Sequence, residues 1–218
     1  MEIEIRLTMK IIFITSFVKK YQKKIVGVVE LDNGEKLQLE PDTIMQFQLQ
    51  TGTEIDEKTL HNIRLADQKR KSLQKALQLI SIRPRSAGEL RERFKREGYL
   101  EETIESSLSH LIDNGYLNDE LFAERFAKSK LQKKDIGEAA LRYELHKKGL
   151  SKQIIENVLT RIYLETPPLD MAITAARKKL RTIRVTDPVK RRRKLYQFLS
   201  QRGFSADIIH RVIAELLN

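Results

Sequence analysis

The stretch SQRGFSADIIH, residues 200–210, decides the fold because weaker copies of it occur twice upstream. The copies are KREGYLEETIE at 95–105 and HKKGLSKQIIE at 146–156. Each contains one glycine, and the spacings between the glycines are 51 and 54 residues: Gly98, Gly149 and Gly203. Self-similarity at a period of this length is typical of repeat architectures. The C-terminal two-thirds of the chain is therefore predicted to be a tandem repeat.

Apolar residues stand at fixed distances from each glycine, eight and four residues before it and one, six, ten and thirteen after it. In chain order within each set they are Leu90, Leu141 and Leu195; Phe94, Leu145 and Leu199; Tyr99, Leu150 and Phe204; Ile104, Ile155 and Ile209; Leu108, Leu159 and Ile213; and Leu111, Ile162 and Leu216. A left-handed glycine ends a helix, and the residue after it packs back on that helix. Ser151 and Ser205 then suit the N-cap of the next helix, which a hydrophobic staple fixes. Each copy thus predicts two helices joined at the glycine.

The first helix of each pair also has a start signal. Ser86 with Glu89 and Asp135 with Glu138 have the spacing of a capping box, and Asp187-Pro188 places proline at the first helical position. These starts make the third helix about one turn longer than the first, and the extra length carries KRRRK. A further helix is predicted before each pair, with the bounds Glu57–Ser81, Asp119–Leu131 and Pro168–Arg181.

The first 65 residues have a different pattern. Asn33-Gly34 separates two apolar runs and is a strong signal for a tight hairpin turn. With Ile11–Phe17 as a third strand, we expect a small antiparallel sheet. Pro41-Asp42 then begins a short helix through Leu49, which Gly52 ends.

The expected fold is therefore mostly α, with three tandem three-helix repeats in an elongated, curved array behind a small β-rich module. The expected boundaries are 1–65 for the N-terminal module, then 66–116, 117–166 and 167–218 for the repeats.

Charge is distributed unevenly along the chain, whose net charge is +11. Residues 1–65 hold 9 Lys and Arg against 10 Asp and Glu, whereas residues 66–218 hold 32 against 20. Such a bias favours a polyanionic or acidic partner. The chain has no cysteine, which excludes disulfides and thiolate chemistry and fits a reducing cytoplasm. No apolar run is long enough for a transmembrane helix, so we expect no membrane contact.

Catalysis finds little support in the sequence. The four histidines are isolated, no HExxH motif is present, and no GxxxxGK[ST] loop can cradle a phosphate. We expect no enzyme activity, no metal and no cofactor.

The run ISIRPRSAGELRERFKREGYLEETIESSLSHLIDNGYLNDELFAERFAKSK resembles the RecX family, regulators of the RecA recombinase, as do IGEAALRYELHKKGLSKQIIENVL and FLSQRGFSADIIHRVI. The similarity covers roughly residues 70–218. It implies tandem three-helix repeats and a monomer that binds in the groove of RecA–DNA filaments and restrains ATP hydrolysis, strand exchange and coprotease function. It also implies weak, non-specific binding of single- or double-stranded DNA, and roles in DNA repair, recombination and the SOS response.

Within the family motifs, most of the matching residues are interpreted as cap or core residues. They are Arg83, Arg85, Ser86, Asp119, Phe122, Ala123, Gly137, Leu145, Lys148, Gly149, Arg202, Gly203, Phe204 and Ser205. The candidate contacts to a partner or nucleic acid are basic: Arg83, Arg85, Arg177, Lys178, Lys179, Arg181, Arg184, Lys190, Arg191, Arg192, Arg193, Lys194 and Arg202.

Each candidate has a structural alternative. Arg83 and Arg85 either reach a phosphate or acidic surface, or solvate their loop and pair with Glu89 and Glu92. The segment 177–194 holds ten Lys and Arg with Asp187 as its one acid, and we interpret it as a contact for a polyanion or acidic partner. Mixed charges on residues 91–97 indicate an internally paired face. Lys147 and Lys148 fit the negative end of a helix dipole.

A rival function is a free-standing duplex-DNA-binding protein, in which the helix pairs act as helix-turn-helix units. A recognition helix presents Arg, Lys, Asn or Gln near its start. Glu101, Glu102 and Glu105 occupy that region in the first copy, and only Ser151-Lys152-Gln153 suits the role. We therefore expect binding to duplex DNA to be weak and salt-sensitive.

Overall fold

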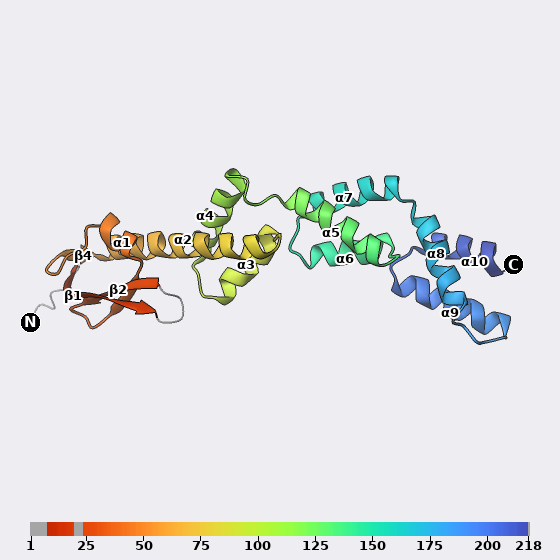
Figure 1. Cartoon of the computed structure of the whole chain (residues 1–218), viewed down its shortest axis with the longest axis horizontal. Helices are drawn as coiled ribbons and strands as arrows, with labels where there is room; N and C mark the ends of the chain where they lie inside the picture. The colour runs from red at the N-terminus through yellow and green to blue at the C-terminus, as the bar shows by residue number, and fades with distance from the viewer. Residues whose placement is uncertain (1–7, 20–23, 218) are drawn as a thin grey trace, which may run out of the picture. The chain divides into compact units, whose positions relative to one another are not determined.

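The computed structural model describes residues 8–19 and 24–217. Within these ranges the chain forms four strands and ten helices in the order β1–β3, α1, β4, α2–α10 (Figure 1). None of the described helices combines the length and the hydrophobicity that a membrane span requires. The described chain forms two compact units: one extends to Ile82 and includes Arg91–Asn114, and the other comprises Arg83–Leu90 and Gly115–Asn218.

A four-stranded antiparallel sheet, in the order β3-β2-β1-β4, begins the first unit. Its strands are β1 (Thr8–Lys19), β2 (Lys24–Leu31), β3 (Lys36–Leu39) and β4 (Glu54–Asp56). The predicted hairpin is confirmed: Gly34 has φ 86°, and its N–H donates to the Leu31 carbonyl at 2.9 Å. The sequence did not predict β4, because a three-residue strand carries no periodic signal and depends on pairing with Thr8–Lys10.

Two helices pack with this sheet, α1 (Pro41–Gln46) and α2 (Glu57–Ile82). The prediction that α1 continues to Leu49 was wrong, because Gln48 takes a left-handed φ of 49° and the chain turns there. The buried carboxylate of Asp67 on α2 accepts from the Glu40 N–H at 2.7 Å and the Thr43 hydroxyl at 3.1 Å. These bonds hold the start of α1 against α2.

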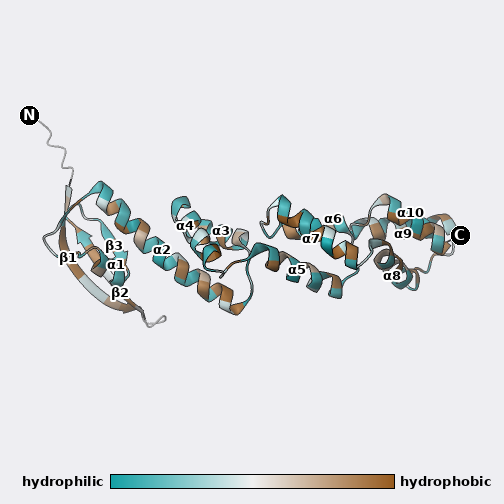
Figure 2. Ribbon diagram, turned by 90° about the horizontal axis from the view of Figure 1, so that it is seen from above, coloured by the Kyte–Doolittle hydropathy of each residue, from teal (hydrophilic) through white to brown (hydrophobic). Residues whose placement is uncertain are grey.

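The helices that follow have the predicted bounds to within two residues, apart from the start of one. They are α3 (Ala87–Arg96), α4 (Glu101–Asp113), α5 (Asp119–Lys133), α6 (Glu138–His146), α7 (Lys152–Glu165), α8 (Pro168–Leu180), α9 (Pro188–Gln201) and α10 (Ala206–Leu217). Hydrophobic and hydrophilic residues alternate along these helices (Figure 2). The apolar positions predicted from the repeat form the cores, which contain Leu141, Leu145 and Ile155 in the second repeat and Leu195, Leu199 and Ile209 in the third.

The repeated glycines end helices as predicted, with φ of 81°, 69° and 81° at Gly98, Gly149 and Gly203. In the first and third repeats the residue after the glycine donates its N–H to the fourth residue before it: Tyr99 to the Phe94 carbonyl at 3.1 Å and Phe204 to the Leu199 carbonyl at 3.2 Å. Both patterns are Schellman motifs, which satisfy carbonyls at the helix end.

Two junctions join consecutive repeats inside the second unit. At the first, the Ser86 hydroxyl donates to the Lys148 carbonyl at 2.5 Å, and the Ala87 N–H donates to Asp119 Oδ1 at 2.8 Å. At the second, the Gly137 N–H donates to the Arg202 carbonyl at 2.8 Å, and the Ala139 N–H donates to the Gly203 carbonyl at 3.2 Å. Each junction sets the start of one repeat's helix against the glycine loop of the next repeat.

The second junction corrects one prediction. Asp135 does not cap α6, because Gly137 is the N-cap residue and the next repeat's carbonyls bind the N–H groups at the helix start. The Asp135 side chain instead accepts from Lys178 Nζ at 2.8 Å. At Ser86 half of the capping box forms, since the Glu89 N–H donates to Ser86 Oγ at 3.1 Å while the Glu89 carboxylate binds other groups.

Candidate interaction surface

The predicted basic candidates fall into two places in the second unit, the link before α3 and the segment from the end of α8 into α9. In the link, Arg83 forms two hydrogen bonds with Glu89, at 2.9 and 3.1 Å. Lys148 Nζ lies 2.7 Å from the same carboxylate. Burial of Glu89 by itself raises its pKa, but the hydrogen bonds from the two cations outweigh that effect and hold the pKa below its usual value. Pairing with Glu89, one of the two interpretations open for Arg83, is thus what the structure contains.

Arg85 is half-buried beside Arg83, and its Nε is buried without a hydrogen-bond partner among the described residues. The alternative that Arg85 pairs with an acid of α3 has no support among the bonds of the described chain. Arg85 remains a candidate contact.

The mixed charges of α3 and its following turn pair internally, as predicted. Arg91 binds Glu105 at 2.8 and 2.7 Å, Arg93 binds Glu97, and Lys95 lies 3.2 Å from Glu101. These ion pairs occupy the first unit's basic side chains near Gly98.

Four of the candidate side chains at α8 and α9 contact their own unit. Lys178 binds Asp135, Arg177 lies 3.8 Å from Glu215, and Lys179 Nζ lies 5.2 Å from the centre of the Phe198 ring. Arg202 donates to the Asp135 carbonyl at 2.9 Å and lies over the other side of this contact, 4.5 Å from the Phe198 ring centre. Their charges are partly compensated within the fold.

The remaining candidates of this segment are more open. Arg181, Arg184, Arg193 and Lys194 are exposed and have neither an ion pair nor a side-chain hydrogen bond with any residue in the described ranges. Lys190 is also exposed, with its Nζ 3.9 Å from Asp187. Arg191 is half-buried, and its Nε lacks a hydrogen-bond partner within the described part of the chain.

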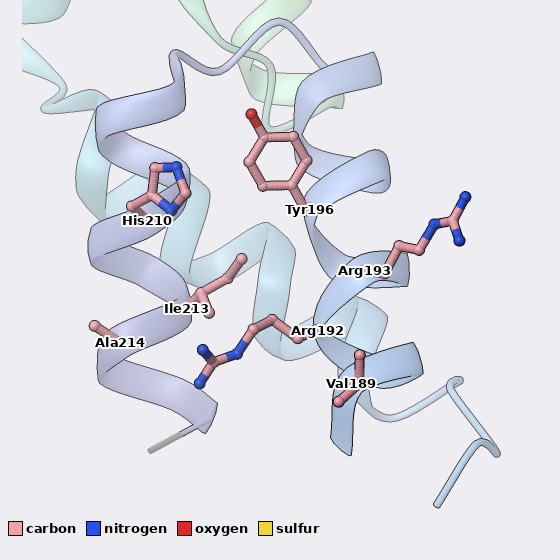
Figure 3. A pocket seen from close by; sticks show the side chains of 7 residues that line it. All are labelled: Val189, Arg192, Arg193, Tyr196, His210, Ile213 and Ala214. Carbon is pink, nitrogen blue, oxygen red and sulfur yellow. The ribbon is translucent and has the colours of Figure 1, made fainter. Parts of the chain in front are cut away.

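A groove lies between α9 and α10 beside this basic segment, with a volume of about 460 Å³. Its lining residues are Val189, Arg192, Arg193, Tyr196, His210, Ile213 and Ala214. Figure 3 shows Arg192 reaching from α9 toward α10, whereas Arg193 points away from α10. The rings of Tyr196 and His210 face each other, with centres 5.7 Å apart.

Sequence reasoning identified Arg192 and Arg193 but missed Tyr196 and His210. A signal was available, because these two residues stand seven positions before and seven after Gly203. The same positions of the first two repeats hold an arginine and a glutamate. An alignment of the three copies that included polar positions would have singled out the third.

Metal chemistry has no clear place in this surface. Among residues 8–19 and 24–217, no group of three or more His, Asp or Glu side chains is arranged to hold a metal ion. The surface as described offers guanidinium and ammonium groups, two aromatic rings and an apolar floor.

Comparisons with known protein families match the helical part of the chain in three successive segments. Residues 73–111 match a model described as RecX, first three-helix domain. Residues 118–159 match the second three-helix domain of RecX, and residues 167–213 match the third.

Relatives of known name cover most of the chain. Regulatory protein RecX of Clostridium botulinum (strain Alaska E43 / Type E3) is 30% identical over 203 residues, which are 92% of this chain and 94% of the relative. Regulatory protein RecX of Prosthecochloris aestuarii is 36% identical over 148 residues, 68% of this chain and 95% of the relative.

Solved structures agree with these relatives. A crystal structure of regulatory protein RecX aligns with a TM-score of 0.67 at 25% identity and covers 94% of this chain and 99% of that chain. The crystal structure of RecX from Lactobacillus salivarius gives a TM-score of 0.63 at 28% identity, with 69% and 97% covered. The order of the three domains, the relatives and the fold agree, and the chain therefore belongs to the RecX family.

Proposed function

We propose that the protein is a non-enzymatic modulator of RecA that inhibits the recombinase. It binds in the groove of the RecA–DNA filament and restrains ATP hydrolysis, strand exchange and coprotease function. Its relatives are named regulatory proteins, and the family resemblance supplies RecA as the partner. In this proposal the protein acts in the cytoplasm as a monomer, in DNA repair, recombination and the SOS response.

The observation that carries the proposal is the basic segment of the last repeat. Arg181, Arg184, Arg193 and Lys194 are exposed without ion pairs among the described residues, whereas Arg91, Arg93 and Lys95 of the first repeat are paired. Unpaired cations are available to phosphates and to carboxylates of a partner. Several weak contacts along one filament add up through multivalency, so no single contact has to be tight.

The rival, a free-standing duplex-DNA-binding protein, has less support. At the start of α4, where a recognition helix would meet the bases, Glu101 and Glu105 are paired with Lys95 and Arg91. Carboxylates at that place repel phosphate. Basic side chains elsewhere still favour weak, salt-sensitive binding.

The test is DNA-dependent ATP hydrolysis by the cognate recombinase, with this protein titrated in at physiological salt. We expect inhibition at well below one molecule per recombinase, together with weak binding to bare DNA in the same buffer. Unchanged hydrolysis alongside tight duplex binding would reject the proposal and favour the rival.

A further inference from the structure

The third repeat breaks a pattern that the first two share. In the first repeat Arg91 binds Glu105 through two hydrogen bonds at 2.8 and 2.7 Å, and in the second Arg142 binds Glu156 through two at 2.9 Å. Both pairs join the two helices that flank the repeated glycine, and both arise from the same positions, seven residues before and after it. The pair therefore closes the outer side of each helix pair with a bidentate ion pair.

In the third repeat the same two positions hold Tyr196 and His210. Their rings are 5.7 Å apart and inclined by 53°, so they make an aromatic contact instead of an ion pair. The side chain of Tyr196 keeps 36% of its surface exposed, and His210 is exposed as well. The groove between α9 and α10 thus offers two accessible ring faces above the apolar floor formed by Ile213 and Ala214 (Figure 3).

A second departure lies at the positions that form the junctions. Ten residues before their glycines the first two repeats have Gly88 and Ala139, and twelve before they have Ser86 and Gly137. Small residues are needed there, since a Cβ on Gly88 would lie 2.5 Å from the Gly149 Cα of the next repeat. The third repeat has arginine at both positions, Arg191 and Arg193.

The helix itself is also extended at this end. α9 begins fifteen residues before its glycine, whereas α3 and α6 begin eleven residues before theirs. Four residues are about one helical turn. The last repeat therefore carries an extra basic turn at the end where the other repeats receive a neighbour, and this turn forms one wall of the aromatic groove.

We propose that the groove between α9 and α10 binds one nucleotide of a single-stranded nucleic acid. The base stacks on the rings of Tyr196 and His210, and Arg192, with Arg193 at the rim, binds the phosphates. This inference rests on the proposed function and deepens it, because it states where the protein contacts the strand within a nucleoprotein filament.

The lining of the groove fits this ligand in three respects. No carboxylate is among the seven lining residues, so nothing within the groove repels a phosphate. The volume of about 460 Å³ lies in the range of sites that enclose small ligands. A nucleotide uses the flat ring faces and the guanidinium together, whereas an acidic peptide uses the arginines and leaves the rings without a planar partner.

The test exchanges the aromatic pair for the ion pair of the other repeats. Tyr196→Arg with His210→Glu leaves the net charge at neutral pH unchanged and rebuilds a bridge that the fold already accommodates twice. We measure fluorescence anisotropy of a labelled oligo(dT) of about 12 nucleotides, within the site sizes usual for single-strand binding, at low salt and without recombinase. Because stacking on an aromatic ring contributes substantially per base, the Kd should rise at least about fivefold.

A matched control places the aromatic pair in the second repeat, as Arg142→Tyr with Glu156→His. In this variant the third repeat is intact, so binding of oligo(dT) should stay within twofold of the unchanged protein. A further variant, Arg192→Gln with Arg193→Gln, should lower the slope of log K against log salt by about 1.4, since about 0.7 is expected per phosphate contact on a single strand. Circular dichroism verifies that each variant is folded.

Three results would overturn the inference. One is an unchanged Kd for the Tyr196→Arg, His210→Glu variant, and another is an equal loss in the second-repeat control. The third is retained oligo(dT) binding with lost binding of an acidic peptide such as decaglutamate, which would make the groove a protein-binding site. Because bare oligonucleotide is the probe, these results are independent of whether the protein inhibits a recombinase.

Discussion

A single carboxylate, Glu89, fixes the start of the second unit. It is held between Arg83 and Lys148, with 14% of its side chain exposed. Lys148 also lies 5.4 Å from the centre of the Phe126 ring, so the cation that binds Glu89 is itself packed. Removing one member of such a cluster leaves a poorly solvated charge without its partner, which is more costly than losing an exposed ion pair.

We expect Glu89→Gln to lower the free energy of unfolding by about 1–3 kcal/mol at pH 7, the range for hydrogen bonds to charged groups. The pKa of Glu89 is lowered in the folded protein. Its stabilisation is therefore complete above the usual glutamate pKa of about 4.3 and is lost as pH falls through the lowered folded value. The measurement is urea unfolding of both proteins at pH 7, 5 and 3.

The control for this change is Glu92→Gln on the same helix, because Glu92 is exposed and its carboxylate has no bond within the described residues. Glu92→Gln should change stability little at any of the three pH values. A stability difference between Glu89→Gln and the unchanged protein that stays constant from pH 7 to pH 3 would contradict the assigned role of the carboxylate.

At the scale of elements, the repeats are joined by backbone contacts between a helix start and a glycine loop. The first N–H groups of a helix have no partner inside it and need acceptors. In α6 the carbonyls of Arg202 and Gly203 supply them, 65 residues or more away in sequence from Gly137 and 64 from Ala139. This contact requires that the loop carry no side chain where the helix backbone approaches.

We expect Gly203→Ala to destabilise the second unit more than Gly115→Ala does. Both glycines have positive φ, 81° and 73°, so alanine costs about 1–2 kcal/mol at either place. A Cβ at Gly203 would also lie 2.6 Å from the Ala140 Cβ, whereas one at Gly115 meets nothing within 4 Å. Overpacking should add at least about 1 kcal/mol at Gly203, measured by urea unfolding. Equal losses would show that the junction tolerates a methyl group.

At the scale of the whole molecule, the excess of positive charge in residues 66–218 is partly used in internal pairs, such as Arg142 with Glu138 and Glu156. The cations that lack such pairs gather in the last repeat. A field of one sign attracts a polyanionic partner and makes its binding depend on salt. The repeat boundaries at 66, 117 and 167 and the contact residues remain predictions of the sequence.

We expect reversal of Arg191, Arg192 and Arg193 to glutamate to raise the concentration for half-inhibition of recombinase ATP hydrolysis by about tenfold or more, since like charges at an interface cost several kcal/mol. The control reverses Lys133, Lys134 and Lys152, which are exposed residues of the second repeat, and changes the net charge by the same amount. Unchanged inhibition by the first variant, or an equal effect of the control, would remove the last repeat's proposed role.

The sequence by itself determined the features that depend on neighbours within about five residues. Glycine at the helix end, serine at Ser151 and the apolar spacing placed the helices, and the structure confirms them because capping bonds such as that from the Ile154 N–H to Ser151 Oγ are local. The hairpin at Asn33-Gly34 followed from turn geometry for the same reason. The family resemblance, carried by several such motifs in order, was confirmed as well.

Only the tertiary structure decided which signals win when distant groups compete. Asp135 and Glu138 have the spacing of a cap, yet α6 is capped by carbonyls of the next repeat, and Asp135 binds Lys178. The groove at Tyr196 and His210 likewise depends on two helices lying side by side. These outcomes depend on contacts between groups far apart in the sequence, whose energies no local pattern contains.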